Sequence, residues 1–312
     1  VSGFNETYTK DITVVIKPCF GTYRGDPVLF SLADGDLPTE TIFGSEAEIL
    51  SAEYADGGAI EVENGKITGL SVEKEDLGKE IVIRAFAKSC GYEIAIKPYT
   101  KVIKTARDFE YFSIKSVVTS GSATKGYTIT APNVFDGYYI IANDIDASGY
   151  THQVVKDADQ NLILNGKNGS KLSSDEDGSR YGQLHMVKNL IGGLTGVFDG
   201  NGCTVSNLTV LDQGLFGIVC GGTIKNAEFI GVTLKGSAYQ RNIALFAQHI
   251  KNSTVSGVTV KANTLYGGTN AKDGLADAGG NRALLAITLD NVKVTDCVFE
   301  YEIANTSKQY VY

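Results

Sequence analysis

Acidic side chains are concentrated in a polar, glycine-bearing stretch between residues 150 and 190. Asp157, Asp159 and Asn161 have the spacing that opens an EF-hand calcium loop. That loop also requires Gly at its sixth position and Glu at its twelfth, and this sequence has neither, so we exclude an EF-hand. We expect no cofactor, and adventitious calcium binding by this segment or by residues 175–177 is the alternative.

Cleavage of a glycosidic bond requires two carboxylates about 5 to 9.5 Å apart. The repeated segments described below place a single acid, Glu228, and no Arg among twelve positions that we expect to face outward. The chain contains no GxSxG elbow, P-loop or GxGxxG motif, and its three His lack the spacing of a zinc protease. We therefore expect no catalytic residue and no resident metal.

The enzyme alternative is a polysaccharide lyase or glycoside hydrolase that draws its acids and bases from loops. The candidate groupings are Asp157 or Asp175 with Arg180, and Asp273 or Asp277 with Arg282.

Loop tyrosines could bind a glycan by stacking, and loop acids together with an arginine could bind its hydroxyls. The ligand-binding candidates are Tyr150, Asp157, Asp159, Asp175, Asp177, Arg180, Tyr181, Tyr239 and Tyr266. The competing interpretation is that the tyrosines are partly buried with their hydroxyls satisfied inside the protein.

A second acidic motif is formed by Asn143, Asp144 and Asp146. It could bind calcium, or its side chains could bond their own backbone at a turn. We favour the turn.

The first hundred residues predict short strands. Residues 11–17 are rich in β-branched side chains, and residues 80–87 alternate apolar side chains on one face. Asn64-Gly65 lies between two strand-like runs, which indicates a tight hairpin because both turn positions need positive φ. Several short strands in this length suggest a β-sandwich over residues 1–103.

The remaining residues, 104–312, begin with a short helix over 105–112, for which Thr105 is a candidate cap. Later segments repeat. Their second, fifth and seventh columns are apolar or Cys, and the fourth column, Asn207, Asn226, Gly257 and Asp296, consists of turn-forming residues. The segments that align without gaps are TVSNLTV (204–210), TIKNAEF (223–229), TVSGVTV (254–260) and KVTDCVF (293–299).

A constant core with variable spacers is typical of a solenoid whose loops lie outside. When such segments stack about 4.8 Å apart, the residues at each aligned position form a ladder of equivalent side chains. This pattern is typical of a single-stranded parallel β-helix. In this interpretation Asp199 belongs to a turn, residues 199–202, that joins two segments of one coil. The fold prediction is all-β: a sandwich followed by a β-helix with a long loop insertion near residues 150–190.

The formal net charge of −8 argues against a nucleic-acid partner, and no apolar segment approaches the roughly 20 residues needed to span a bilayer. Five cysteines occur without a CxxC pair. Cys19 and Cys90 could form a disulfide, and two free buried thiols are the alternative.

Two family resemblances add further expectations. The run GAIEVENGKITGL followed by GKEIVIRAFAKS resembles bacterial immunoglobulin-like domains, which usually serve as spacers or docking units. The motifs TARDF, GYYIIANDIDASG, GVFDGNGCTVSNLTV and GLFGIVCGGTIKNAEFIGVTL resemble GLUG-type repeat proteins of bacterial surfaces. That resemblance implies a right-handed β-helix, an extracellular or cell-surface location and a role in adhesion. The expected partner is an extracellular glycan or a host or cell-surface protein, and a purely mechanical spacer is a further alternative.

Overall fold

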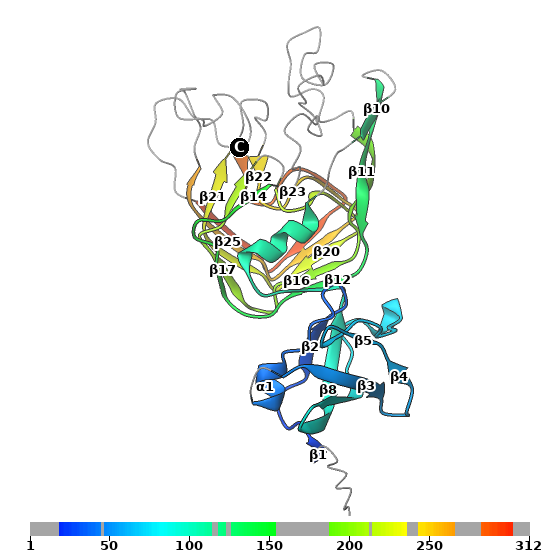
Figure 1. The fold of residues 1–312 in the computed structure, drawn as a ribbon. Coiled ribbons are helices and arrows are strands. Elements are labelled where there is room, and N and C mark those ends of the chain that lie inside the picture. Colours follow the sequence, from blue (N-terminus) through cyan, green and yellow to red (C-terminus); the bar gives the residue numbers. More distant parts are fainter. Residues whose placement is uncertain are drawn as a thin grey trace, which may run out of the picture. The chain divides into compact units, whose positions relative to one another are not determined.

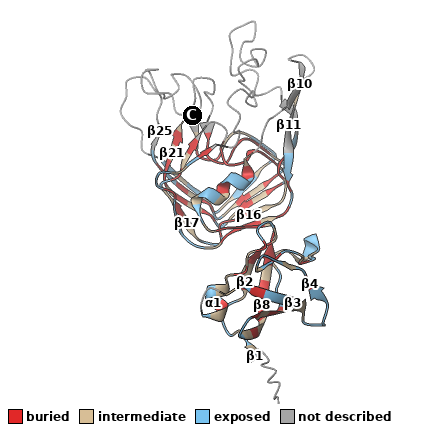
Figure 2. Cartoon of the chain, in the orientation of Figure 1, coloured by how far each residue is buried: buried red, intermediate tan, exposed pale blue. Residues whose placement is uncertain are grey.

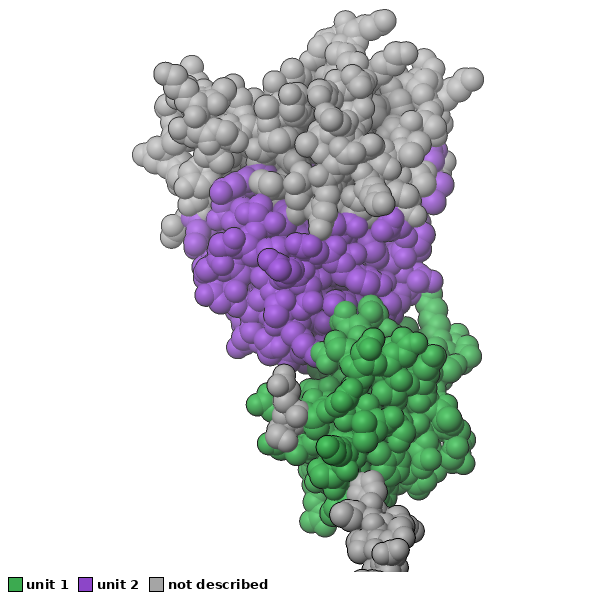
Figure 3. Space-filling view, in the orientation of Figure 1, with its two compact units in different colours: residues 1–98 green, residues 99–312 purple. Residues whose placement is uncertain are grey.

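The computed structural model describes residues 19–44, 47–113, 118–122, 126–153, 187–211, 214–235, 243–265 and 282–301. The chain divides into two compact units, Val1–Pro98 and Tyr99–Tyr312 (Figure 3). Both are built mainly from β-strands. Among the described residues, no helix is long and apolar enough to cross a membrane.

The first unit contains a six-stranded sheet with the path β1-β8-β7-β3-β4, in which β2 also pairs with β8. On β7 the predicted alternation is confirmed: Ile83, Ala85 and Ala87 are buried, and Arg84 faces outward between Glu53 and Glu93. The predicted strand over residues 11–17 lies outside the described residues. The elements of this unit are β1 (Cys19–Thr22), β2 (Val28–Ser31), α1 (Thr39–Phe43), β3 (Ile49–Tyr54), β4 (Ala59–Ile60), β5 (Val62–Glu63), β6 (Lys66–Ile67), η1 (Lys74–Asp76), β7 (Ile81–Ala87) and β8 (Cys90–Tyr99).

The predicted hairpin is present. β5 and β6 pair antiparallel, and the two residues between them, Asn64 and Gly65, have φ values of 50° and 74°. Two consecutive left-handed residues match the right-handed twist of the flanking strands, which is why Asn-Gly is favoured there.

The second unit contains three large sheets that the chain visits repeatedly in the same order, and a separate two-stranded sheet formed by the short strands β22 (Ile243–Ala244) and β26 (Arg282–Ala283), which open passes 4 and 5 as defined below. The first sheet has the order β10-β11-β15-β19-β23-β27, the second β28-β24-β20-β16-β12-β9, and the third contains β13, β14, β17, β18, β21, β25 and β29. Apart from the antiparallel pair of β10 (Val118–Ser122) and β11, all neighbouring strands in these sheets are parallel (Figure 1).

We call one visit to the three sheets a pass. Five passes are described, and their strands are as follows: β11 (Gly126–Phe135), β12 (Tyr138–Ile141), β13 (Ile145–Asp146) and β14 (Thr151–Gln153) in pass 1; β15 (Val187–Leu194), β16 (Val197–Asp199), β17 (Thr204–Ser206) and β18 (Thr209–Leu211) in pass 2; β19 (Gly217–Cys220), β20 (Thr223–Lys225) and β21 (Glu228–Lys235) in pass 3; β22 (Ile243–Ala244), β23 (Ala247–Lys251), β24 (Thr254–Ser256) and β25 (Thr259–Leu265) in pass 4; β26 (Arg282–Ala283), β27 (Ala286–Asp290), β28 (Lys293–Thr295) and β29 (Val298–Tyr301) in pass 5.

Left-handed residues mark many of the corners where passes 2 to 5 change direction. From the first sheet to the second, these are Gly221, Asn252 and Asn291; from the second to the third, Asn226, Gly257 and Asp296; and within the third, Asn207 and Gly231. All have φ between 49° and 80°. Asn and Gly tolerate this conformation at lowest cost, so the turn chemistry of the sequence sets the corners.

The gapless alignment of the repeats is wrong for its first member. Residues 204–206 pair with 228–230 in the third sheet, whereas 223–225 pair with 197–199 in the second sheet. Asn207 is therefore a left-handed turn residue, as predicted, but its structural counterpart is Gly231 rather than Asn226. The alignment failed because both sheets carry the same pattern of a polar residue followed by an apolar one.

The three sheets of the second unit enclose one apolar core (Figure 2). Each sheet contributes an inward ladder, such as Phe198, Ile224 and Val255 from the second sheet, and Val205 and Phe229 from the third. These side chains are completely buried.

The helix predicted over 105–112 is present as the 3₁₀ helix η2 (Ala106–Phe112), and Thr105 is its N-cap residue. Phe109 and Phe112 are completely buried, and the Phe112 ring packs edge-on against Phe198 and Phe216. The strand before it, β9 (Lys101–Ile103), pairs with β12, so residues 101–103 lie in the second unit rather than in the first, where the predicted boundary put them.

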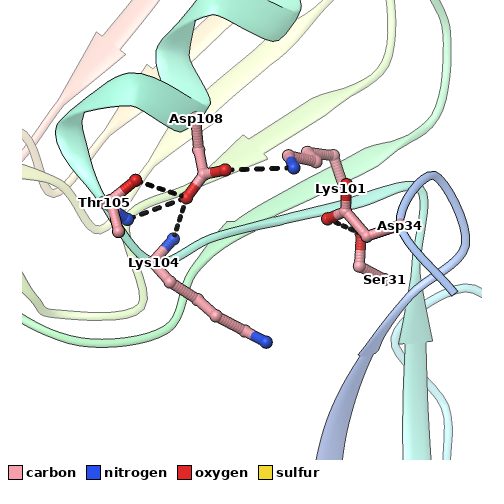
Figure 4. Close-up of polar contacts among 6 residues, drawn as sticks. All are labelled: Ser31, Asp34, Lys101, Lys104, Thr105 and Asp108. Atoms are coloured by element: carbon pink, nitrogen blue, oxygen red, sulfur yellow. Dashed lines mark hydrogen bonds and ion pairs between the residues drawn. The ribbon is translucent and has the colours of Figure 1, made fainter. Parts of the chain in front are cut away.

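Asp108 holds the start of η2. Its Oδ2 accepts hydrogen bonds from the backbone N–H of Lys104 and Thr105, at 3.0 and 2.8 Å, and Oδ1 lies 3.1 Å from Nζ of buried Lys101 (Figure 4). Burial alone would raise the pKa of Asp108, but these hydrogen bonds and the ammonium outweigh it and hold the pKa below its usual value. The carboxylate is therefore a structural cap.

Candidate functional site

A polar, open groove of about 550 Å³ lies at the corner where passes 2 to 4 cross from the second sheet to the third. Its lining combines carboxylates, amides, a hydroxyl and glycine backbone. The lining residues are Asp199, Asn201, Gly202, Asn226, Ala227, Glu228, Gly257 and Thr259.

The groove exists because one corner is longer than the next two. In pass 2, residues 200–203 separate β16 from β17, whereas two residues suffice at 226–227 and 257–258. The longer turn is tied to its neighbour, since the N–H of Gly202 donates to the carbonyl of Asn226 at 2.9 Å. Asn201 and Gly202 thus lie beside the shorter corners as one wall of the groove.

Asp199, the last residue of β16, is 7% exposed. Its carboxylate accepts three hydrogen bonds and forms one ion pair. Its Oδ1 receives the N–H of Asn201 at 2.9 Å and Nδ2 of Asn226 at 3.3 Å. Its Oδ2 receives the Tyr138 hydroxyl at 2.8 Å and lies 3.1 Å from Nζ of Lys225. One carboxylate therefore fixes side chains or backbone from three successive passes.

This environment keeps Asp199 ionised. Burial opposes ionisation, but the Asn201 N–H, the Tyr138 hydroxyl and the Lys225 ammonium outweigh it, so the pKa of Asp199 lies below its ordinary value. Burial likewise opposes the charge on Lys225, yet its contacts with Tyr138 and Asp199 raise the pKa of the ammonium. Both partners are charged, and neither is suited to exchange a proton near neutral pH.

Two tyrosines, Tyr138 and Tyr99, lie near the ion pair of Asp199 and Lys225. Nζ of Lys225 lies 5.2 Å from the ring centroid of Tyr138, in cation–π range, and the Tyr99 ring meets the Tyr138 ring edge-on at 5.1 Å. Burial is the main cause that raises the pKa of both phenols, to about 12 for Tyr99. The two hydroxyls stay protonated, which lets Tyr138 remain a donor to Asp199.

Two further lining residues lie at the start of strands of the third sheet. Glu228 and Thr259 are register partners at the starts of β21 and β25, and Glu228 Oε2 accepts a 2.6 Å hydrogen bond from the Thr204 hydroxyl. A Cβ atom at Gly257, another lining residue, would lie 3.2 Å from Oδ1 of Asn226. Glycine therefore leaves that amide oxygen uncovered, in addition to allowing a φ of 61°.

Most of the predicted ligand-binding residues lie outside the described residues: Asp157, Asp159, Asp175, Asp177, Arg180, Tyr181, Tyr239 and Tyr266. So do Asp273 and Asp277 of the enzyme alternative.

Tyr150 is described, and its ring packs against the apolar core of the second unit. Its hydroxyl lies 3.5 Å from Nδ1 of the completely buried His152, and burial raises its pKa to about 12. Nε2 of His152 in turn lies 3.1 Å from the carbonyl of Leu215. The Tyr150 ring is therefore partly buried against the core, and its role in ligand binding stays a prediction.

The motif of Asn143, Asp144 and Asp146 agrees with the turn interpretation only in part. Asp146, the last residue of β13, accepts local hydrogen bonds at Oδ1 from the N–H and hydroxyl of Ser148. The other contacts reach the next pass: Asp144 Oδ1 accepts the N–H of Thr204 at 2.8 Å, and Asp146 Oδ1 accepts from Asn207 Nδ2. Within the described part of the chain, no three His, Cys, Asp or Glu side chains are grouped so as to hold a metal.

Cys19 and Cys90 are free thiols in the structure, and they are direct register partners on the parallel strands β1 and β8. The predicted pairing remains a prediction. Cys203 and Cys297 are half-buried thiols at the corners between the second and third sheets, where Ala227 and Val258 stand in other passes.

Sequence reasoning placed Asp199 in a turn but missed its partners Tyr138 and Lys225 and the groove beside them. One signal was available: the run Asp-Gly-Asn-Gly is longer than the corresponding turns and carries two residues suited to positive φ. The partners themselves depend on register between passes, which no local pattern encodes.

Comparison of the chain with protein-family models, with curated proteins and with solved structures found no match.

Proposed function

We propose that this chain is a non-catalytic extracellular surface protein whose second unit is a right-handed β-helix that serves as a rigid binding scaffold. The ordered visits to three parallel sheets and the left-handed residues at their corners support the β-helical interpretation. In the same proposal the first unit is a bacterial immunoglobulin-like module that acts as spacer or docking unit.

Binding is favoured over catalysis because both carboxylate oxygens of Asp199 already accept hydrogen bonds from the protein itself. A glycosidase needs one carboxyl group free to attack or to accept a proton and a second that can donate one. Asp199 has the lowered pKa of a structural anion, and both of its oxygens already accept from the protein. Its role is to hold the groove in a fixed shape, which suits binding.

The insertions of the second unit support a scaffold as well. The connections 154–186, 236–242 and 266–281 all follow a strand of the third sheet and precede a strand that opens the next pass. Gln153 and Lys235, which precede the first two of these connections, both pair with Leu211 of the pass between them. Variable segments anchored on a regular framework are a common way for proteins to present binding residues.

The experiment is a glycan array on the purified full chain, run beside a reducing-sugar assay and an assay for unsaturated products on the same polysaccharides. Binding without cleavage is the expected result. Cleavage that is lost on substitution of Asp175 or Asp277 would instead establish the lyase or hydrolase alternative. A folded protein that binds no glycan and no cell-surface protein would favour a mechanical spacer.

A further inference from the structure

We infer that the groove at the corner of passes 2 to 4 binds an uncharged, hydroxyl-rich glycan, and that Glu228 is the residue that sets this preference. The inference rests on the proposed binding function and adds the site and the ligand class. Three properties of the groove support it: the chemistry of its lining, its charge and its shape.

The lining offers both donors and acceptors. Asn201 and Asn226 present amide groups, Thr259 a hydroxyl, and Glu228 a carboxylate. An amide or hydroxyl can donate and accept, whereas a carboxylate only accepts. Asn226 Nδ2 already donates to Asp199, and Glu228 Oε2 already accepts from Thr204. Sugar hydroxyls both donate and accept, so a polyhydroxylated ligand can bond to the hydrogen-bonding capacity that these groups retain, whereas an apolar ligand would leave it unpaired.

The balance of charge excludes acidic glycans. Asp199 is neutralised by Lys225 at 3.1 Å. Glu228 is half-buried, and among the described residues no Lys, Arg or His nitrogen forms an ion pair with it. One uncompensated carboxylate attracts hydroxyl donors and repels uronates or sulfates, because like charges brought together during binding are strongly unfavourable.

A single carboxylate also fits a sugar better than a cation. The hard cations Ca²⁺ and Mg²⁺ take six to eight oxygen ligands, several of them carboxylates. Here the second carboxylate, Asp199, has its oxygens occupied by Tyr138, Lys225, Asn201 and Asn226. The groove thus lacks the donor set of a metal site.

The shape favours a short chain of sugar rings lying across successive passes. Neighbouring passes are about 4.8 Å apart, as strands of one sheet are. The turn carrying Asn201 and Gly202 bounds the groove at pass 2, and Thr259 lies at pass 4. The fixed hydrogen bonds to Asp199 hold Asn226 in place, so the groove is ordered before a ligand arrives, which lowers the entropic cost of binding.

The experiment measures binding of two soluble oligosaccharide panels to the full chain by isothermal titration calorimetry. One panel is neutral (gluco-, xylo- and manno-oligosaccharides) and the other anionic (oligogalacturonates and sulfated oligosaccharides). The expected result is binding of at least one neutral oligosaccharide and none of the anionic ones. Glu228→Gln should weaken the neutral ligand about tenfold or more, as expected for loss of a charged hydrogen-bond acceptor.

A steric pair of variants provides the control. Thr259→Phe should fill the groove and abolish binding, whereas Thr254→Phe places the same ring on the same pass but outside the groove lining. Circular dichroism confirms that each variant is folded. Neutral-glycan binding that survives Thr259→Phe and Glu228→Gln overturns the inference but leaves the binding scaffold standing. A wild-type chain that prefers the anionic panel also overturns the inference. A wild-type chain that binds neither panel overturns the inference and in addition counts against glycan binding as the function.

Discussion

The hydroxyl of Tyr138 donates a 2.8 Å hydrogen bond to Oδ2 of Asp199, across two consecutive passes of the second unit. The same oxygen lies 3.1 Å from the Lys225 ammonium, which belongs to the next pass. Three passes are thus connected through one carboxylate oxygen of Asp199, a residue that is only 7% exposed. A hydrogen bond or ion pair requires one particular partner, so these contacts fix the register of the stacked strands. Apolar side chains in a ladder can pack against several neighbours and fix the register less strictly.

Replacing Asp199 by Asn should lower the free energy of unfolding by about 1–3 kcal/mol, because the amide keeps the shape but loses the charge that Lys225 and Tyr138 require. The measurement is urea denaturation followed by circular dichroism at neutral pH.

The pH dependence of the stability of Asp199→Asn relative to the wild type provides a second readout. The pKa of Asp199 in the folded state lies below its ordinary value of 3.8, so the stabilisation is present above that value and is lost as pH falls through the folded pKa. Wild type and Asp199→Asn should therefore converge in acid. A gap that persists at the lowest pH would mean that the charge is not what stabilises the corner.

Tyr138 and Asp199 should also show direct energetic coupling. In a double-mutant cycle with Tyr138→Phe and Asp199→Asn, we expect the two effects to be non-additive by about 1 kcal/mol. Tyr138→Phe combined with Lys261→Met provides the control, since Lys261 pairs with Glu300 between passes 4 and 5 and shares no partner with Tyr138. Equal coupling in both cycles would show that the hydrogen bond has no specific contribution.

The burial of His249 leads us to expect that the free energy of unfolding decreases in weak acid. It is 2% exposed, its Nδ1 contacts the hydroxyl of Thr288, and burial lowers its pKa from 6.5 to about 4. Between these values the unfolded chain takes up a proton that the folded chain refuses, so stability falls as pH decreases from 6.5 towards 4. The contribution is about 3–4 kcal/mol when each pKa unit counts about 1.4 kcal/mol.

The check is the difference in unfolding free energy between pH 7 and pH 4.5, compared between wild type and His249→Gln. Because the carboxylates titrate alike in both proteins, the comparison isolates the histidine. The wild type should lose about 2 kcal/mol more than the variant, as expected for a group that has not yet reached its folded pKa. Identical losses would contradict a buried, neutral His249.

Several of these features were accessible from sequence and others were not, for physical reasons. The Asn64-Gly65 hairpin and the helix after Thr105 are determined by neighbouring residues, and both were predicted correctly. Asn207 was assigned to a turn correctly, because its residue type tolerates positive φ, but to the wrong corner. The four-residue turn at 200–203 displaced the repeat, and a gapless comparison could not detect that.

The candidate groove was beyond sequence reasoning because its parts come from different passes. Asp199 and Lys225 become neighbours only through the register of β16 against β20. Tyr150, predicted as a ligand-binding residue, is partly buried and packs against the core, and a tyrosine in a polar stretch carries no local sign of such packing.

Asn207 offers a test of the left-handed corners that separates backbone from side chain. Its φ is 60°, and its Nδ2 donates to Asp146 Oδ1 at 3.0 Å. Both Asn207→Gly and Asn207→Ala lose that hydrogen bond, but only alanine incurs the left-handed penalty of about 1–2 kcal/mol. We expect the glycine variant to be the more stable of the two by about that amount in urea denaturation. Two variants of equal stability would show that this corner does not require positive φ.

Cys19 and Cys90 provide the last prediction. As register partners on adjacent parallel strands, their Cα atoms should be about 4.8 Å apart, within the 4.4–6.8 Å that a disulfide spans. Incubation with oxidised glutathione should convert the two thiols to a disulfide, with two equivalents of reduced glutathione released and the two thiol protons transferred to it. The bridge should stabilise the first unit by about 2–4 kcal/mol, chiefly by restricting the unfolded chain. Thiol titration and peptide mapping identify the pair, and Cys19→Ser is the control, in which Cys90 should remain reduced or carry a single glutathione. Oxidation that instead links Cys90 to Cys203, Cys220 or Cys297 in the folded wild type would contradict the pairing.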